Sequence, residues 1–292
     1  MDCKQRVGID LHIHTTASDG TSSPAQILTL ARELELGAIA ITDHDTLDSV
    51  KTSLQLGIPP ELKFLTGVEI SATPPPPFRC PGSFHILGYG FRPEDPVLNQ
   101  ILFQLQDARN NRNPRIIERL NRLGLDLSLE EVSQIAGHGL LGRPHIARLM
   151  VKKGYASSIN DAFDNYLGKG KPAYVDKFRV DTPQAIKLIS DAGGLPILAH
   201  PYLLETESEK ELEDLVVMMK TMGLKGLEVY YPDHPPEHTA LYVALAQKHG
   251  LLMTGGTDFH GALKPEIHLG TGKGDFFVPY ELYETLQQHI SR

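Results

Sequence analysis

Asp10-Leu11-His12-Ile13-His14 decides how this chain is interpreted, and Ser18-Asp19-Gly20 follows it closely. The apolar residues that lead up to the two histidines predict a β-strand. Side chains alternate between the two faces of a strand, so His12 and His14 point to the same side. Imidazole and carboxylate groups suit Zn, Mn or Fe, and Asp19 lies just beyond the strand end. The stretch therefore predicts the beginning of a metal site.

The same pattern, an apolar run next to a histidine or a carboxylate, recurs along the chain. Chance explains one such ending easily, but it explains this many poorly. A single ion takes about three to five protein ligands. We therefore expect a polynuclear centre, because nine candidate ligands lie at predicted strand ends: His12, His14, Asp19, His44, Glu69, His85, His200, Asp258 and His260.

Charge favours phosphate as the substrate of such a centre. Three divalent ions, the carboxylates of Asp19, Glu69 and Asp258, and a bridging hydroxide would leave a surplus of about two positive charges. That surplus matches a phosphate dianion and would repel a cationic substrate. Hydrolysis of a phosphate ester is therefore the expected reaction. A carboxylate that bridges ions must be central, and Glu69 is the candidate. The alternative at this point is a set of unrelated surface and core histidines.

The composition is that of an ordinary globular chain. Its 292 residues suffice for one large domain, with or without an insertion. No apolar run approaches the roughly 18–20 residues of a membrane helix, so we expect no membrane contact. Cys3 and Cys80 are too few for a disulfide framework, and no room precedes the first strand for a signal peptide, so we expect a cytoplasmic location. A net charge of −8 argues against binding of duplex nucleic acid. The oligomeric state stays open.

Predicted strands and helices alternate over most of the chain. Helices are expected at 24–36, 182–192, 207–222 and 237–249, each followed by glycine and the next strand. This alternation predicts parallel strands wrapped by helices. Because the chemistry lies at strand ends and fewer than eight strands can be counted, we expect a distorted (β/α) barrel. Residues 1–95 and 182–292 would form it.

Residues 96–181 break the alternation. They show helical patterns, with a capping box at Ser128–Glu131 and only one candidate strand, Ala173–Val175. We expect a helical insertion that lies over the C-terminal face of the barrel and recognises the substrate.

The insertion carries the candidate substrate-binding residues. Arginines at three- and four-residue steps predict a basic stripe along one helix. Its first part, Arg109 to Arg112 with Asn110 and Asn111 between them, is expected to reach the site, whereas Arg115, Arg119 and Arg122 are expected to face solvent. Arg143, between glycine and proline, and Lys171, on a glycine-rich loop, are further candidates for phosphate binding. More cations than one phosphate requires indicate a substrate with two phosphates.

Three further acidic residues lie beside a candidate ligand or at a predicted strand end but are not assigned as ligands. Asp43 and Asp45 flank His44, and each could orient an imidazole, protonate the leaving oxygen or shape the turn. Glu228 also ends a strand, and we interpret it as structural.

The motifs together resemble the PHP (polymerase and histidinol phosphatase) superfamily over the whole chain. The resemblance rests on Asp10–Gly20, Thr42–Asp45, Gly67–Glu69, His85–Gly88, Ala199–Pro201 and Gly256–His260. It implies a distorted (β/α)7 barrel with three divalent ions, Mn or alternatively Fe or Zn. It also implies how the ligands are shared: His12, His14, Glu69 and Asp258 for one ion, Glu69, His85 and His200 for the second, and Asp19, His44 and His260 for the third. Asp19, His44 and Glu69 are assigned to catalysis as well.

The insertion resembles one branch of that superfamily, which hydrolyses nucleoside 3′,5′-bisphosphates. The resemblance is carried by Arg109-x-x-Arg112, Arg143-Pro144-His145 and Lys171-Pro172. It implies that the metals act on the 3′-phosphate while the cations hold the 5′-phosphate. The expected partner is a small nucleotide or a short RNA. Alternatives are 5′→3′ exonuclease action on short RNA or DNA, hydrolysis of histidinol phosphate, hydrolysis of C–N bonds, and a metal-stabilised binding module without activity.

Overall fold

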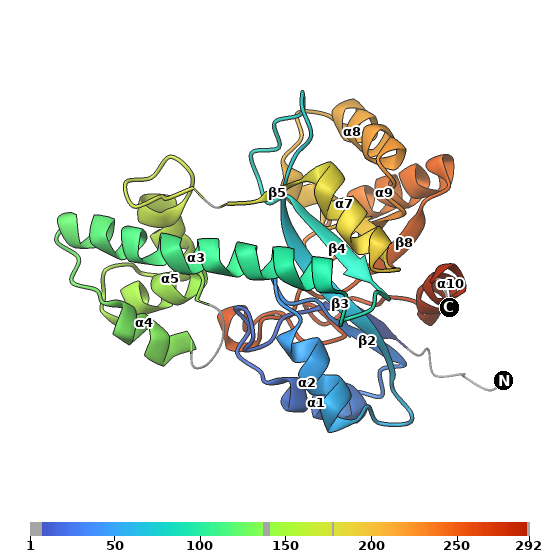
Figure 1. Ribbon diagram of the computed structural model, residues 1–292, viewed down its shortest axis with the longest axis horizontal. Coiled ribbons are helices and arrows are strands. Elements are labelled where there is room, and N and C mark those ends of the chain that lie inside the picture. Colours follow the sequence, from blue (N-terminus) through green and yellow to red (C-terminus); the bar gives the residue numbers. More distant parts are fainter. Residues whose placement is uncertain (1–7, 137–140, 177, 291–292) are drawn as a thin grey trace.

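The computed structural model describes residues 8–136, 141–176 and 178–290, and Cys3 lies outside the described residues. A barrel-like sheet forms one part of the molecule, and a helical lobe projects from it (Figure 1). The expected distorted barrel is confirmed. Its strands follow one another in the order β1 (Ile9–Ile13), β2 (Ala38–Ile41), β3 (Lys63–Thr73), β4 (His85–Tyr89), β6 (Leu195–Leu198), β7 (Gly226–Tyr230) and β8 (Leu252–Gly255).

The distortion comes from β4, which runs antiparallel to both of its neighbours, β3 and β6. The other pairs of neighbouring strands in this order are parallel. The reversal places the amino end of β4 beside the carboxyl ends of its neighbours, and His85 pairs with Ser71 near the end of β3. His85 therefore begins its strand yet faces the same end of the barrel as ligands that follow theirs. Two backbone hydrogen bonds connect β1 to the segment after β8: the N–H of His14 donates to the carbonyl of Phe259, and the N–H of Phe259 donates to the carbonyl of His12.

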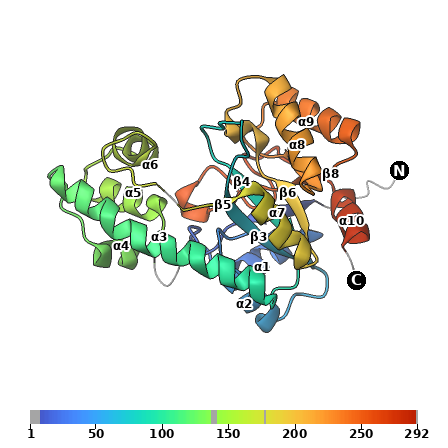
Figure 2. The ribbon, with the colours of Figure 1, turned by 45° about the horizontal axis from the view of Figure 1, so that its top comes forward.

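Helices cover the outside of the barrel (Figure 2). Ser23 caps the first of them through a capping box with Gln26, and Pro24 takes its first position, as the sequence predicts. None of the described helices is both long and apolar enough to cross a membrane. The helices of this part are α1 (Pro24–Glu33), α2 (Asp48–Leu56), α7 (Thr182–Asp191), α8 (Glu209–Thr221), α9 (Pro236–His249) and α10 (Tyr280–His289).

The lobe consists of residues between β4 and β5 (Val180–Asp181), and it has a hydrophobic core of its own. The long helix α3 (Pro96–Arg122) runs from the barrel into the lobe (Figure 1). Leu98 and Leu102 on its first half pack in the barrel core, whereas Ile116 on its second half packs in the lobe core. The lobe also contains α4 (Leu129–Ala136), α5 (Arg143–Lys152), α6 (Ile159–Ala162) and a π-helical turn (Phe163–Leu167).

The candidate strand at Ala173–Val175 does not form, because other residues of the lobe bind its backbone groups. The N–H of Ala173 donates to the carbonyl of Tyr166 at 3.0 Å, and the carbonyl of Tyr174 accepts from Arg119. The strand of this region is instead β5, which pairs with Ala72 and Thr73 of β3. The capping box at Ser128–Glu131 is present and begins α4.

Candidate metal centre

The strand ends bring all nine candidate ligands to one end of the barrel. His12 lies in β1 and His14 directly after it, whereas Asp19 lies in the loop that follows. His44 and His200 come shortly after β2 and β6, Glu69 lies within β3, His85 begins β4, and Asp258 and His260 follow β8. Seven of the nine are buried, whereas the side chains of His44 and His85 are 15% and 16% exposed. The imidazole rings pack against one another, for example His14 on His260 with centroids 4.2 Å apart.

Glu69 occupies the centre of this group, and its side chain is 1% exposed. Imidazole nitrogens surround both of its carboxylate oxygens. Oε1 lies 2.8 Å from Nδ1 of His85 and 3.0 Å from Nε2 of His200. Oε2 lies 2.8 Å from Nδ1 of His44, 3.2 Å from Nε2 of His14 and 3.5 Å from Nε2 of His12. This is the position that a carboxylate shared between ions requires.

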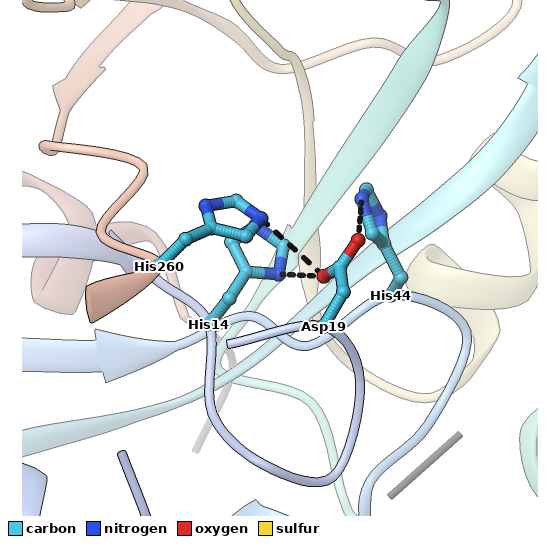
Figure 3. A group of neighbouring side chains, drawn as sticks. All are labelled: His14, Asp19, His44 and His260. Atoms are coloured by element: carbon cyan, nitrogen blue, oxygen red, sulfur yellow. Dashed lines mark ion pairs between the residues drawn. The ribbon is translucent and has the colours of Figure 1, made fainter. Parts of the chain in front are cut away.

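The other two carboxylates lie on either side of His14. Asp19 faces His260, with Oδ1 3.3 Å from Nε2, and also faces Nδ1 of His14 and Nε2 of His44 (Figure 3). Oδ1 of Asp258 lies 3.0 Å from Nε2 of His14. His44 therefore lies between Glu69 and Asp19, with one ring nitrogen directed at each.

The donor atoms of the cluster fit divalent ions. Buried atoms without a hydrogen-bond partner include Nε2 of His12, Nε2 of His14 and Oε2 of Glu69. Leaving such atoms unsatisfied costs free energy, so a ligand among them is expected. Nitrogen and oxygen donors at this spacing suit Mn, Fe or Zn. Three groups have all of their donor atoms within 4.8 Å of one another: His14, Asp19, His44 and His260; His12, His14 and Glu69; and His44, Glu69 and His85.

The charges of the cluster also favour a cationic occupant. Burial alone would raise the pKa of Glu69, but His44 and His85 hold this pKa well below its usual range. Burial alone would lower the pKa of His14, but the adjacent carboxylates of Asp258 and Glu69 raise this pKa to about 10. The carboxylates thus stabilise positive charge on the imidazole side, and metal ions would take the place of those protons.

The three groups resemble the predicted sharing of ligands but differ from it in detail. Asp19, His44 and His260 occur together as predicted, with His14 added. His44, rather than the predicted His200, joins Glu69 and His85. His200 is nevertheless close, with Nε2 3.4 Å from Nδ1 of His85. The sharing of ligands among ions stays a prediction.

Glu228 supports two of the ligands from behind. It is fully buried, and its Oε1 lies 2.8 Å from Nδ1 of His12. Its Oε2 accepts from the backbone N–H of His200 at 2.7 Å. The sequence places Glu228 at a strand end but gives no sign of these partners. It is structural in the sense that it orients His12 and the turn of His200.

Asp258 is also oriented by residues outside the group of candidate ligands, through hydrogen bonds to its Oδ2. Oδ2 accepts from the hydroxyl of Tyr231 at 2.9 Å and from Nζ of Lys264 at 2.6 Å. Oδ1 is thereby directed at His12 and His14. Neither Tyr231 nor Lys264 was a candidate in the sequence, because neither belongs to a ligand motif.

The two aspartates beside His44 shape the surrounding turns. Asp43 accepts from the backbone and hydroxyl of Thr15 at 2.8 and 2.7 Å and from the hydroxyl of Ser18 at 2.5 Å, which fixes the loop after His14. Asp45 accepts from Ser71 and from Arg109. Of the roles left open for Asp43, the contacts favour the structural one.

A cavity of about 1050 Å³ joins three of the candidate ligands to the basic residues of the lobe. Arg112 lines it, is 5% exposed, and has Nε and Nη1 without a hydrogen-bond partner. Burial and the neighbouring Arg109, Arg143 and Arg179 lower the pKa of Arg112. Arg143 lies between two aromatic rings, with its guanidinium carbon 5.6 Å from the centroid of Phe163 and 5.5 Å from that of Tyr174. Asp19, His44 and His85 line the same cavity.

The remaining basic candidates divide into those inside and those outside this cavity. Asn110, Asn111 and Lys171 are exposed and do not line it. Lys169 and Arg179, which were not expected from the sequence to bind substrate, do line it. Arg115 and Arg122 are exposed as expected, whereas Arg119 is half-buried and donates to the carbonyl of Tyr174.

Comparison with known proteins agrees with these observations. The sequence model of the PHP domain matches residues 10–178. The chain is 35% identical over 273 residues to the 5′-3′ exoribonuclease Rnm of Escherichia coli, which covers 92% of this chain and 90% of that protein. It is 28% identical over 263 residues to a 3′,5′-nucleoside bisphosphate phosphatase of Chromobacterium violaceum, covering 86% of this chain and 87% of that one.

Two solved structures have the same fold over almost their whole length. A proposed metal-dependent phosphoesterase from Bifidobacterium adolescentis superposes with a TM-score of 0.82 at 28% identity, covering 98% of this chain and 97% of that one. An amidohydrolase from Chromobacterium violaceum with bound sulfate superposes with a TM-score of 0.83 at 27% identity, covering 98% of both chains.

Proposed function

This chain belongs to the PHP domain family of metal-dependent phosphoesterases, and from that premise we propose that it removes the 3′-phosphate from nucleoside 3′,5′-bisphosphates. The products are a nucleoside 5′-monophosphate and inorganic phosphate. One observation carries the proposal: Arg112, buried and short of partners, lines the same cavity as the metal ligands Asp19, His44 and His85. One cavity therefore offers a hydrolytic site and a separate anion site.

The anion site suits a phosphate group. A buried guanidinium that lacks hydrogen-bond partners is costly, and an oxyanion that accepts from it removes this cost. Arg143 adds a second guanidinium, already held in place by Phe163 and Tyr174. A cationic substrate such as histidinol phosphate would bring its amine towards these arginines, so we regard it as the weaker alternative.

We assign three divalent ions, with Mn as the expected metal, to the nine ligands. When bound, such ions activate water and stabilise the charge that develops on the phosphoryl and leaving oxygens. The chain's own residues set the geometry: Glu69 lies between five imidazoles, and Glu228 and Tyr231 orient the ligands from outside. Arg112 and Arg143 hold the second phosphate, so the ester bond to be cleaved lies at the metal ligands. Hydrolysis of C–N bonds, one of the alternatives, would not require a second anion site, so it leaves Arg112 and Arg143 unexplained.

A second candidate function, removal of nucleotides from the 5′ end of short RNA, follows from the same arrangement. If the 5′-phosphate binds the arginines, the 3′-phosphate of the first nucleotide lies at the metal ligands. This 3′-phosphate is a monoester in a nucleoside 3′,5′-bisphosphate and a diester, bonded to the next nucleotide, in RNA. The cavity of about 1050 Å³ is slightly larger than the roughly 300–1,000 Å³ usual for small ligands, which leaves room for more than a mononucleotide. The relative from Escherichia coli is named as an exoribonuclease.

Phosphate release by the Mn-loaded protein tests the proposal. The substrates are a nucleoside 3′,5′-bisphosphate, short 5′-phosphorylated RNA, histidinol phosphate and a plain aryl phosphate. We expect kcat/KM to be highest for the bisphosphate. A higher value for RNA, with mononucleotides as products, would favour the second candidate. A preference for histidinol phosphate would refute both.

A further inference from the structure

Asp45 connects the metal centre to the arginine cavity through buried contacts. It follows the ligand His44 in the turn after β2 and is fully buried. Its φ of +57° lies in the left-handed region, which residues other than glycine adopt only when surrounding contacts hold them there. Those contacts run to two different parts of the molecule.

Asp45 forms hydrogen bonds to two residues of β3, Glu69 and Ser71. Its backbone N–H donates to the carbonyl of Glu69 at 3.0 Å. Its carboxylate accepts from the N–H and the hydroxyl of Ser71, both at 2.8 Å. The turn that carries His44 is thereby held against the strand that carries Glu69.

Asp45 also accepts hydrogen bonds from two residues of α3, Gln106 and Arg109. Nε2 of Gln106 donates to the carbonyl of Asp45 at 2.8 Å, and Nη2 of Arg109 donates to its carboxylate Oδ2 at 2.5 Å. Gln106 and Arg109 are three residues apart and so share one side of the helix. Arg112 lies a further three residues along that side, in the cavity. The place of Arg112 relative to His44 is therefore set through Asp45.

We propose that Asp45 is a positioning residue that fixes the spacing between the metal centre and the anion site, with Arg109 as its partner. This rests on the proposed function, because it assumes one phosphate group at each place. The charge of Arg109 is matched by a carboxylate that is 1% exposed, whereas Nε and Nη1 of Arg112 have no partner. The second phosphate of the substrate therefore goes to Arg112, and Arg109 serves mainly to anchor α3.

A fixed spacing gives selectivity for substrates whose two phosphates match it. A small displacement of one binding group can cost about a hundredfold in rate when the reacting group must be aligned. An aryl phosphate occupies the metal centre alone and does not depend on the spacing. Loosening the contact should therefore lower the ratio of kcat/KM for the bisphosphate to kcat/KM for the aryl phosphate, which we call the selectivity ratio.

The test is a double-mutant cycle on the Mn-loaded protein with Asp45→Asn, Arg109→Gln and the double variant. We expect each single variant to lower the selectivity ratio at least tenfold, chiefly through kcat for the bisphosphate, with metal content unchanged. The double variant should be no worse than the worse single variant, because both break the same contact. Asp43→Asn is a matched control beside the same ligand: it disturbs the loop of His14 and should lower both activities alike. Arg122→Gln, on the exposed part of α3, should leave the ratio unchanged.

Three results would overturn the inference. The first is an unchanged selectivity ratio in Asp45→Asn, and the second is a double variant whose loss is the product of the two single losses. The third is loss of metal from Asp45→Asn, which would make Asp45 a support of the metal centre alone. A wild-type protein that hydrolyses the aryl phosphate but not the bisphosphate would refute the proposed function, and this inference with it.

Discussion

Glu228 holds His12 from behind: Oε1 of Glu228 lies 2.8 Å from Nδ1 of His12, and both side chains are fully buried. The other ring nitrogen of His12, Nε2, faces Glu69 and Asp258. The contact therefore fixes which nitrogen is available to a metal ion and how the ring is turned.

Glu228→Gln should weaken metal binding without removing a ligand. The amide keeps the shape of the carboxylate but lacks its charge, so His12 becomes a poorer and less firmly oriented ligand. We expect Mn affinity to fall by about 10- to 100-fold, measured by competition with a chelator. Glu213→Gln is the matched control, because Glu213 contacts His249 at 2.8 Å far from the ligand motifs. Equal affinity in Glu228→Gln and the wild type would contradict the role given to Glu228.

Arg112→Gln should raise KM for a nucleoside 3′,5′-bisphosphate. Hydrogen bonds to charged groups contribute about 1.5–3 kcal/mol, so the expected rise is about 10- to 100-fold. KM for an aryl phosphate should change by less than about threefold on the same grounds. Arg115→Gln, one turn further along α3 and exposed, is the control. A similar rise in KM for both substrates would show that Arg112 does not bind the second phosphate of the bisphosphate.

Removal of metal should destabilise the protein. Without ions, the cluster leaves buried atoms such as Nε2 of His12 and Oε2 of Glu69 without hydrogen-bond partners. An ion that binds only the folded state stabilises it by mass action, about 2.7 kcal/mol at a hundred times its Kd. Calorimetry should show that chelation lowers Tm and that Mn restores it. In Glu69→Gln, which lacks the central carboxylate charge, Tm should barely respond to Mn; a full response would mean that Glu69 is not a shared ligand.

His234 should make the protein sensitive to acid. Burial lowers the pKa of His234 to about 4, although its Nδ1 donates to the carbonyl of Val229 at 3.1 Å. Between pH 6.5 and 4 the unfolded chain binds a proton at this residue and the folded chain does not, so stability is lost as the pH falls through this window. A shift of this size corresponds to about 3 kcal/mol.

The comparison with His234→Asn isolates this effect from the titration of the metal ligands. Asparagine keeps a donor for Val229 but does not titrate. In urea unfolding of the metal-free proteins, the wild type should lose about 3 kcal/mol relative to His234→Asn between pH 6.5 and 4. A difference in unfolding free energy that stays constant over this range would show that His234 is not buried in its neutral form.

The convergence of the nine candidate ligands at one end of the barrel was predictable because the chain repeats one local pattern. An apolar run that ends in histidine or carboxylate is visible without knowing the fold, and a barrel brings such ends together. The central place of Glu69 followed from the need for a shared carboxylate. The reversal of β4 was not predictable, since His85 begins its strand and a short apolar run gives no direction.

The contacts around the ligands were not predictable, because they depend on tertiary structure. Glu228 and His12 are 216 positions apart, and no motif relates them. Asp45 and Arg109 are 64 positions apart, in different parts of the fold. On the glycine-rich loop the sequence pointed to Lys171, but Lys169 lines the cavity, because the course of that loop is set by packing in the lobe.

The most direct test of the proposed reaction is phosphorus NMR of a nucleoside 3′,5′-bisphosphate that has been treated with the Mn-loaded protein and then freed of Mn. We expect the 3′-phosphate signal to disappear while inorganic phosphate and the 5′-monophosphate appear in equal amounts. Formation of the 3′-monophosphate, or an unchanged spectrum with fully loaded protein, would contradict the proposed reaction.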